Sequence, residues 1–195
     1  MKNQKKSSNV AVVAIFFATM LVIHLLSSLI FNLWPVPIKP TIVHIPVIIA
    51  SIVYGPRIGA ALGGLMGIIS LINNTIILLP TSYLFSPFVA HGNFNSLLIA
   101  LVPRILIGIF PYYIYKSMKN RFGLLLAGAI GSATNTVFVL TGIFIFFSSV
   151  YGGNIQTMLA TIISANSIIE LIISALLTFL IVPKLLKLKN NHVKA

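Results

Sequence analysis

Long apolar runs separated by short polar breaks fill almost the whole chain. Five of these runs reach the roughly 20 residues that a helix needs to cross a bilayer, and a sixth is shorter. Prolines, asparagines and basic residues interrupt the runs, so each break is expected to be a loop. We therefore expect an all-α integral membrane protein, a single six-helix domain over residues 1–195. The expected spans are residues 10–31, 42–54, 57–79, 96–115, 122–147 and 155–186.

Three parts of this pattern depart from straight spanning helices. Residues 42–54 would form a helix of only about 20 Å, shorter than the roughly 30 Å hydrocarbon core. This run is expected to borrow from the proline-rich loop before it, or to stop short beneath that loop. Pro103 and Pro111 are expected to bend the fourth span. The basic tail of residues 187–195 is expected to be disordered.

Small residues recur at helical spacing in two of the spans. Gly59, Gly63 and Gly67 form a stripe in the third span that predicts close packing against another helix. Ala11, Ala14 and Ala18 share a face of the first span. Two interpretations of this alanine face stay open, namely packing inside the bundle and docking of a partner subunit.

The composition and the placement of charge support the membrane assignment. Only 7% of the residues are charged and the mean hydropathy is +1.06, whereas soluble domains carry about 25% charged residues. Six spans would put both termini on one side, together with eleven of the 13 Lys and Arg residues. The positive-inside rule then predicts cytoplasmic termini. It also accounts for the net charge of +12 without a nucleic-acid partner.

One loop concentrates aromatic and amide side chains between the third and fourth spans. It contains Tyr83, Phe85, His91, Asn93 and Asn95, and it leads directly into an apolar helix. A segment this polar and this rich in turn residues is not expected to lie in lipid. We interpret it as a lid over a pocket for a small polar molecule.

Two ionisable residues are expected inside the membrane, where each needs a partner or a task. Arg104 and Glu170 could form a structural ion pair, or Arg104 could bond to helix carbonyls. Alternatively, Arg104 could meet an anionic ligand. Asn135 and Asn166 are expected at mid-span, where their amides could bond across helices or face a ligand.

The sequence excludes several classes of chemistry. There is no cysteine, and Glu170 is the single acidic residue, so neither a thiolate site nor a metal–carboxylate cluster is available. No phosphate-binding loop and no hydrolase or metalloprotease motif occurs. We therefore expect no enzymatic activity, no metal and no cofactor. Any energy for uphill transport is expected to come from another protein.

The order of several short motifs resembles the substrate-binding S components of energy-coupling factor (ECF) vitamin transporters. The likeness covers nearly the whole chain and includes a proline-rich first outer loop and a long loop before the fourth span. The motifs are AIFFA at residues 14–18, VPRILIG at 102–108, GSATNT at 131–136 and NSIIE at 166–170.

This resemblance implies a vitamin-binding protein of the bacterial plasma membrane with an outward-facing pocket. It also implies docking on a membrane T component through Ala11, Ala14 and Ala18, with two cytoplasmic ATPases driving the assembly. The motifs around Arg104 and Glu170 recur among members for different vitamins, which favours a scaffold role. Arg104 nevertheless remains a candidate ligand contact. The other implied pocket residues are Trp34, Tyr83, Phe85, His91, Asn93, Asn95, Asn135 and Asn166.

The segment from Phe85 to Lys116 is most similar to the pantothenate members. Pantothenate is small, anionic and hydroxylated. These properties suit a binding site that offers a cationic side chain and several amide side chains. Pyridoxine, hydroxymethylpyrimidine, riboflavin and folate remain alternatives, as does a stand-alone channel or carrier for small solutes. The absence of an inverted internal repeat argues against the stand-alone channel. An enzyme built on Glu170 is disfavoured because His91 would lie far above it in depth.

Overall fold

The computed structural model describes residues 2–33, 42–147 and 167–194, and these residues form an all-helical bundle without strands. The helices are α1 (Lys2–Leu33), α2 (Ile45–Tyr54), α3 (Pro56–Ile76), η1 (Ser82–Leu84), α4 (Phe94–Ile107), α5 (Phe110–Met118), α6 (Arg121–Phe147) and α8 (Ile168–Lys194). Within these ranges, five helical segments are long and apolar enough to cross a membrane, with α4 and α5 counted as one segment. The remainder of the expected sixth span, before Ser167, lies outside the described residues.

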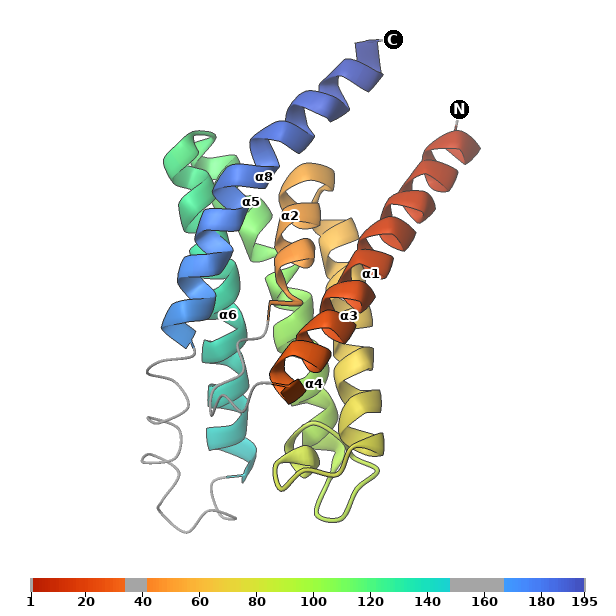
Figure 1. Ribbon diagram of the computed structural model, residues 1–195, viewed down its shortest axis with the longest axis vertical. Helices are drawn as coiled ribbons and strands as arrows, with labels where there is room; N and C mark the ends of the chain where they lie inside the picture. Colours follow the sequence, from red (N-terminus) through yellow and green to blue (C-terminus); the bar gives the residue numbers. More distant parts are fainter. Residues whose placement is uncertain (1, 34–41, 148–166, 195) are drawn as a thin grey trace.

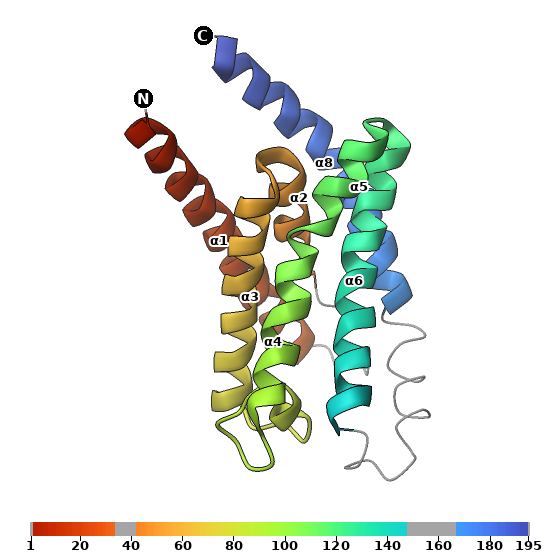
Figure 2. The same ribbon diagram turned by 180° about the vertical axis from the view of Figure 1, so that it is seen from behind.

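The two ends of the bundle differ in the residues that they carry. Figures 1 and 2 show both chain ends at one end of the bundle, together with the α2–α3 and α5–α6 connections. The loop between α3 and α4, which includes η1, lies at the opposite end. The segments that reach the end with the termini carry eleven basic residues: Lys2, Lys5 and Lys6 in the first turns of α1, Arg57 at the start of α3, Lys116, Lys119 and Arg121 around the α5–α6 connection, and Lys184, Lys187, Lys189 and Lys194 in the C-terminal half of α8.

The short second helix fills the centre of the bundle. At 10 residues, α2 spans only about 15 Å, and nine of these residues are buried. Pro46 lies in its first turn, where the missing backbone N–H costs nothing, and Gly55 ends it at φ 103°. The helix alone is therefore shorter than a membrane span, and the loop from which it was expected to borrow lies outside the described residues.

The glycine stripe of α3 packs directly on the backbone of α4, as its spacing predicts. A side chain at Gly59 would run into Gly108, one at Gly63 into the carbonyl of Arg104, and one at Gly67 into the carbonyl of Ala100. The two helices approach this closely only because these positions carry no side chain. The contact fixes the position of Arg104 along the length of the bundle relative to α3.

The fourth span breaks after Ile107, between the two prolines that were expected to bend it. Pro103 lies inside α4, which continues to Ile107, and Pro111 lies in the first turn of α5. Gly108 and Ile109 connect the two helices. Gly108 is the residue whose backbone lies against Gly59 of α3, so the break coincides with one of the close approaches between α3 and the fourth span.

The first helix lies along the outside of the bundle. One side of α1 packs inward through Met20, which is fully buried, and through Phe16, whose ring meets Tyr54 edge-on at 5.8 Å. A hydrogen bond of 2.8 Å joins Nε2 of His24 to Nδ2 of Asn73 in α3. The opposite side of α1 is exposed, including Ala11, Ala14 and Ala18. Packing within the described bundle therefore does not use the alanine face.

The basic tail is helical, which corrects the expectation of disorder for residues 187–195. Helix α8 continues to Lys194. Lys189 explains part of this order, because its Nζ donates a hydrogen bond of 2.6 Å to the carbonyl of Val53 and lies 5.0 Å from the centre of the Tyr54 ring. The tail is thus hydrogen-bonded to the end of α2. The acceptor is the Val53 carbonyl, one of those in the last turn of a helix that have no partner within the helix.

Candidate functional site

Hydrogen bonds from buried serines shape the loop between α3 and α4. Ser82 Oγ donates to the carbonyl of Ile77 at 3.0 Å and accepts from the backbone N–H of Leu79 at 2.9 Å. Ser86 Oγ lies 2.7 Å from Thr75 Oγ1 at the end of α3. Short side chains that bond to nearby backbone favour such turns. The loop is therefore a folded structure rather than a loose connection.

Asn93 and Ser96 form the start of α4. The Asn93 side chain accepts from the backbone N–H of Asn95 at 2.9 Å, while Ser96 Oγ accepts from the backbone N–H of Asn93 at 3.1 Å. This reciprocal arrangement is a capping box. Ser96 Oγ also donates to the carbonyl of Tyr83 at 2.6 Å, so the cap holds the loop against α4. Asn93, expected to face a ligand, is an exposed helix cap.

Two loop aromatics pack on the ends of α4 and α6. The ring of Tyr83 meets Phe147 edge-on, with centroids 5.7 Å apart. Phe85 packs against the same small cluster, which includes Leu84 and Ile99. Both aromatic side chains are half-buried. The structure therefore brings these two predicted site residues together at the inner side of the loop.

The Arg104 side chain is buried and runs toward this aromatic cluster. Only 8% of the residue is exposed. Its Nη1 donates to the carbonyl of Ile99 at 2.6 Å, and its Cζ lies 5.2 Å from the centre of the Phe85 ring. Pro103 explains the first contact, because a proline at that position has no N–H to offer the carbonyl four residues earlier. Of the structural alternatives for Arg104, the structure shows the bond to a helix carbonyl.

The donors of Arg104 are not all used. Its Nε is buried and has no hydrogen-bond partner among the described residues. On α6, which packs against α4, the Oδ1 atom of Asn135 is likewise buried without a partner in that part of the chain. Buried polar groups usually find hydrogen bonds, so each such group needs an explanation. Glu170, which is buried on α8, is not one of these unpartnered groups.

An open cavity of about 570 Å³ lies over the loop end of the bundle. Tyr83 and His91 line it, and His91 adopts a left-handed backbone conformation with φ 66°. The φ of His91 is uncommon for a residue other than glycine. The remaining lining residues are Thr75, Leu78, Leu79, Pro80, Ser82, Phe88, Val89 and Ala90. Two of the predicted site residues therefore share this cavity.

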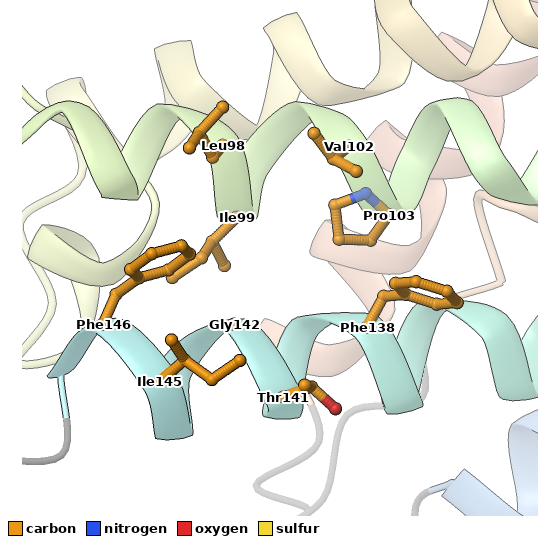
Figure 3. Close-up of a pocket in the computed structure, with 9 residues that line it drawn as sticks. All are labelled: Leu98, Ile99, Val102, Pro103, Phe138, Thr141, Gly142, Ile145 and Phe146. Carbon is orange, nitrogen blue, oxygen red and sulfur yellow. The ribbon is translucent and has the colours of Figure 1, made fainter.

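A second hollow, of about 270 Å³, lies between α4 and α6 and is almost wholly apolar (Figure 3). Phe138 and Phe146 extend from α6 toward α4 in this view, and Gly142 leaves room between them. The other lining residues are Leu98, Ile99, Val102, Pro103, Thr141 and Ile145. None of the predicted site residues in the described ranges lines this hollow, and its surface does not suit a charged ligand.

The sequence interpretation missed the residues that hold the site in place. Ser82, Ser86 and Ser96 are buried and bond to the loop backbone, but none was singled out. An Asn followed three residues later by Ser, before an apolar run, was a usable signal for a helix cap. Trp34 and Asn166 lie outside the described residues. No group of three His, Cys, Asp or Glu side chains able to hold a metal occurs in the described ranges.

The fold and these residues define a multi-pass membrane protein with a folded loop at one end and a buried arginine, Arg104, in contact with that loop through Phe85. The chain belongs to the family of substrate-specific components of ECF transporters, whose model matches residues 8–182. Members of this family are transporter components rather than enzymes. The protein is accordingly a multi-pass protein of the bacterial plasma membrane.

Two curated relatives carry more specific names. The chain is 49% identical over 193 residues to the "Pantothenic acid transporter PanT" of Lactococcus lactis subsp. cremoris, covering 96% of this chain and 98% of the relative. It is 29% identical over 158 residues to the "Pantothenate transporter PanT" of Leuconostoc mesenteroides subsp. mesenteroides, covering 71% of each.

Proposed function

We propose that this chain is the pantothenate-binding S component of an ECF importer. The observation that carries the proposal is the 49% identity to the Lactococcus pantothenic acid transporter over nearly the full length of both proteins. The buried Arg104, whose Nε is without a partner among the described residues, adds chemical support. A carboxylate is the natural partner for such a guanidinium.

The proposed site lies beneath the α3–α4 loop. Arg104 contacts the carboxylate of pantothenate, and Asn135 bonds to one of its hydroxyl or amide groups. Tyr83 and Phe85 cover the ligand, while His91 lines the entrance. Asn93 supports the loop through the α4 cap, and Asn95 lies in the first turn of that helix. Trp34 and Asn166 belong to the same proposal on the basis of the sequence.

The proposed orientation puts both termini in the cytoplasm. The clustering of basic residues at the end that holds the termini supports this orientation. The α3–α4 loop and its cavity then face outward, where an imported vitamin arrives. The exposed face of Ala11, Ala14 and Ala18 docks on the T component, and two cytoplasmic ATPases supply the energy.

Reconstitution into liposomes tests this function. The chain alone should bind labelled pantothenate without accumulating it, and ATP-driven accumulation should require the T component and both ATPases. Accumulation by the chain alone would contradict the proposal, because import would then need neither a T component nor the ATPases.

Variants of the alanine face sharpen the same experiment. Ala14→Trp or Ala18→Trp should hold a partner helix away, so that uptake fails while pantothenate binding stays near the wild-type level. Leu180→Trp is the matched control, because Leu180 is a large exposed apolar residue on a different helix. Equal losses of binding and uptake in the alanine variants would refute the docking role.

A further inference from the structure

The guanidinium of Arg104 is held on two of its sides. Its Nη1 donates to the carbonyl of Ile99 at 2.6 Å, and its Cζ lies over the Phe85 ring, 5.2 Å from the ring centre. Its Nε is buried without a hydrogen-bond partner among the described residues. A guanidinium carries five N–H donors in one plane. The edge that carries Nε is therefore left for a further acceptor.

The direction of the Arg104 side chain follows from α4 itself. Pro103 leaves the Ile99 carbonyl without its usual helical donor. Ile99 lies nearer the start of α4, so the bond draws the guanidinium toward the α3–α4 loop. This contact fixes Nη1 but leaves the plane of the guanidinium to be set by a second contact.

Phe85 provides that second contact from a well-anchored position. Its backbone N–H donates to the carbonyl of Ser82 at 3.0 Å, and the preceding Tyr83 carbonyl accepts from Ser96 Oγ at 2.6 Å. The ring itself packs on the cluster that contains Leu84 and Ile99. Phe85 therefore connects the folded loop to the buried cation.

We infer that Phe85 is a positioning residue that sets the preference of the site for a carboxylate over a neutral ligand. The inference rests on the proposed function. A planar guanidinium can stack on an aromatic face and still bind a carboxylate along its edge. Without the ring, the long arginine side chain must be ordered by the ligand, and that ordering lowers affinity.

A neutral analogue separates this role from general support of the loop. Pantothenol is the alcohol in which a hydroxymethyl group replaces the carboxylate of pantothenate. It keeps the remaining hydroxyls and the amide but loses the charge that Arg104 recognises. A defect in guanidinium position should weaken pantothenate more than pantothenol, whereas a general defect of the loop should weaken both equally.

The test compares three replacements of Phe85. Phe85→Leu removes the ring, and trifluorophenylalanine at this position keeps the shape but weakens the negative face of the ring. Phe85→Tyr is the matched control that keeps an electron-rich ring. Affinities of the purified proteins for pantothenate and pantothenol are measured by competition against labelled pantothenate. Melting temperatures without ligand show that each variant is folded.

We expect the ratio of pantothenate to pantothenol affinity to fall about tenfold in Phe85→Leu and severalfold in the fluorinated protein. Phe85→Tyr should keep the wild-type ratio. An unchanged ratio in the fluorinated protein and in Phe85→Leu would overturn the inference, even if both ligands bind more weakly. Failure of the wild-type protein to bind pantothenate would instead contradict the proposed function.

Discussion

Pro103 and Arg104 act together because they are adjacent in α4. The proline leaves a carbonyl unpaired, and the arginine beside it reaches back to bond with that carbonyl. This bond stabilises the buried cation and uses only one of its nitrogen atoms, Nη1. The rest of the guanidinium is left for other contacts. A structural and a ligand-binding role for Arg104 are therefore compatible.

Asn93 is the second residue whose role depends on local geometry. Asn93→Ala should remove the α4 cap at a cost of about 1 kcal/mol, lowering both the melting temperature and the affinity for pantothenate. The loss should reach the site because Ser96, the other half of the cap, also holds the Tyr83 carbonyl. Thermal unfolding and ligand binding of the purified variant check this expectation.

Asn93→Ser is the control for that prediction, since serine caps helices about as well as asparagine. Both stability and affinity should return close to wild-type values in this variant. If Asn93→Ser binds as weakly as Asn93→Ala while remaining stable, the amide itself contacts the ligand.

Sequence composition could single out this loop as a candidate site but could not assign a role to each of its amide side chains. Asn93, Asn95 and His91 were equivalent candidates in the sequence, because each offers hydrogen-bonding groups in one polar segment. Only the fold shows that Asn93 caps α4 while His91 lines an open cavity. Such roles depend on backbone direction, which residue types alone do not fix.

At the level of helices, the contact between α3 and α4 is the most sharply defined. Gly63→Ala should destabilise the bundle by about 1–3 kcal/mol, because the added methyl group would run into the Arg104 carbonyl. It should also weaken pantothenate binding by shifting Arg104. Unfolding in detergent, followed with and without ligand, measures both effects.

Gly64→Ala is a matched control on the adjacent position of α3. A methyl group there would have Ile105 Cγ1 at 4.0 Å as its nearest neighbour. The change should therefore be neutral, or stabilising by about 0.5–1 kcal/mol through helix propensity. Equal destabilisation by the two variants would show that the close approach at Gly63 is not the cause.

Helix packing was predictable where it depends on spacing alone. Glycines four residues apart lie on one face whatever surrounds them, so the α3 stripe could be recognised in the sequence. The helical tail could not, because its order involves Lys189 meeting Val53, a residue far away in the sequence. The break after Ile107 likewise coincides with a contact between Gly108 and α3 that the sequence does not reveal.

For the whole molecule, the basic residues belong to segments at the end opposite the α3–α4 loop, and this arrangement predicts the orientation in the membrane. The chain has no cysteine, so single cysteines can report exposure to each side. Ala90→Cys in the α3–α4 loop should react with an impermeant thiol reagent on intact cells, and Ser117→Cys should react only after lysis. Both positions are exposed, unlike the buried Ser86 in the same loop. The reverse pattern would invert the orientation.

The proposed function requires that this chain by itself forms a specific site for pantothenate. The most direct test is equilibrium binding of labelled pantothenate to the purified wild-type protein, without partners and without ATP. We expect saturable binding at one site per chain, displaced by unlabelled pantothenate and weakened at least tenfold by Arg104→Gln, because a hydrogen bond to a charged group contributes about 1.5–3 kcal/mol. A folded wild-type protein that shows no saturable pantothenate binding would contradict the proposed function.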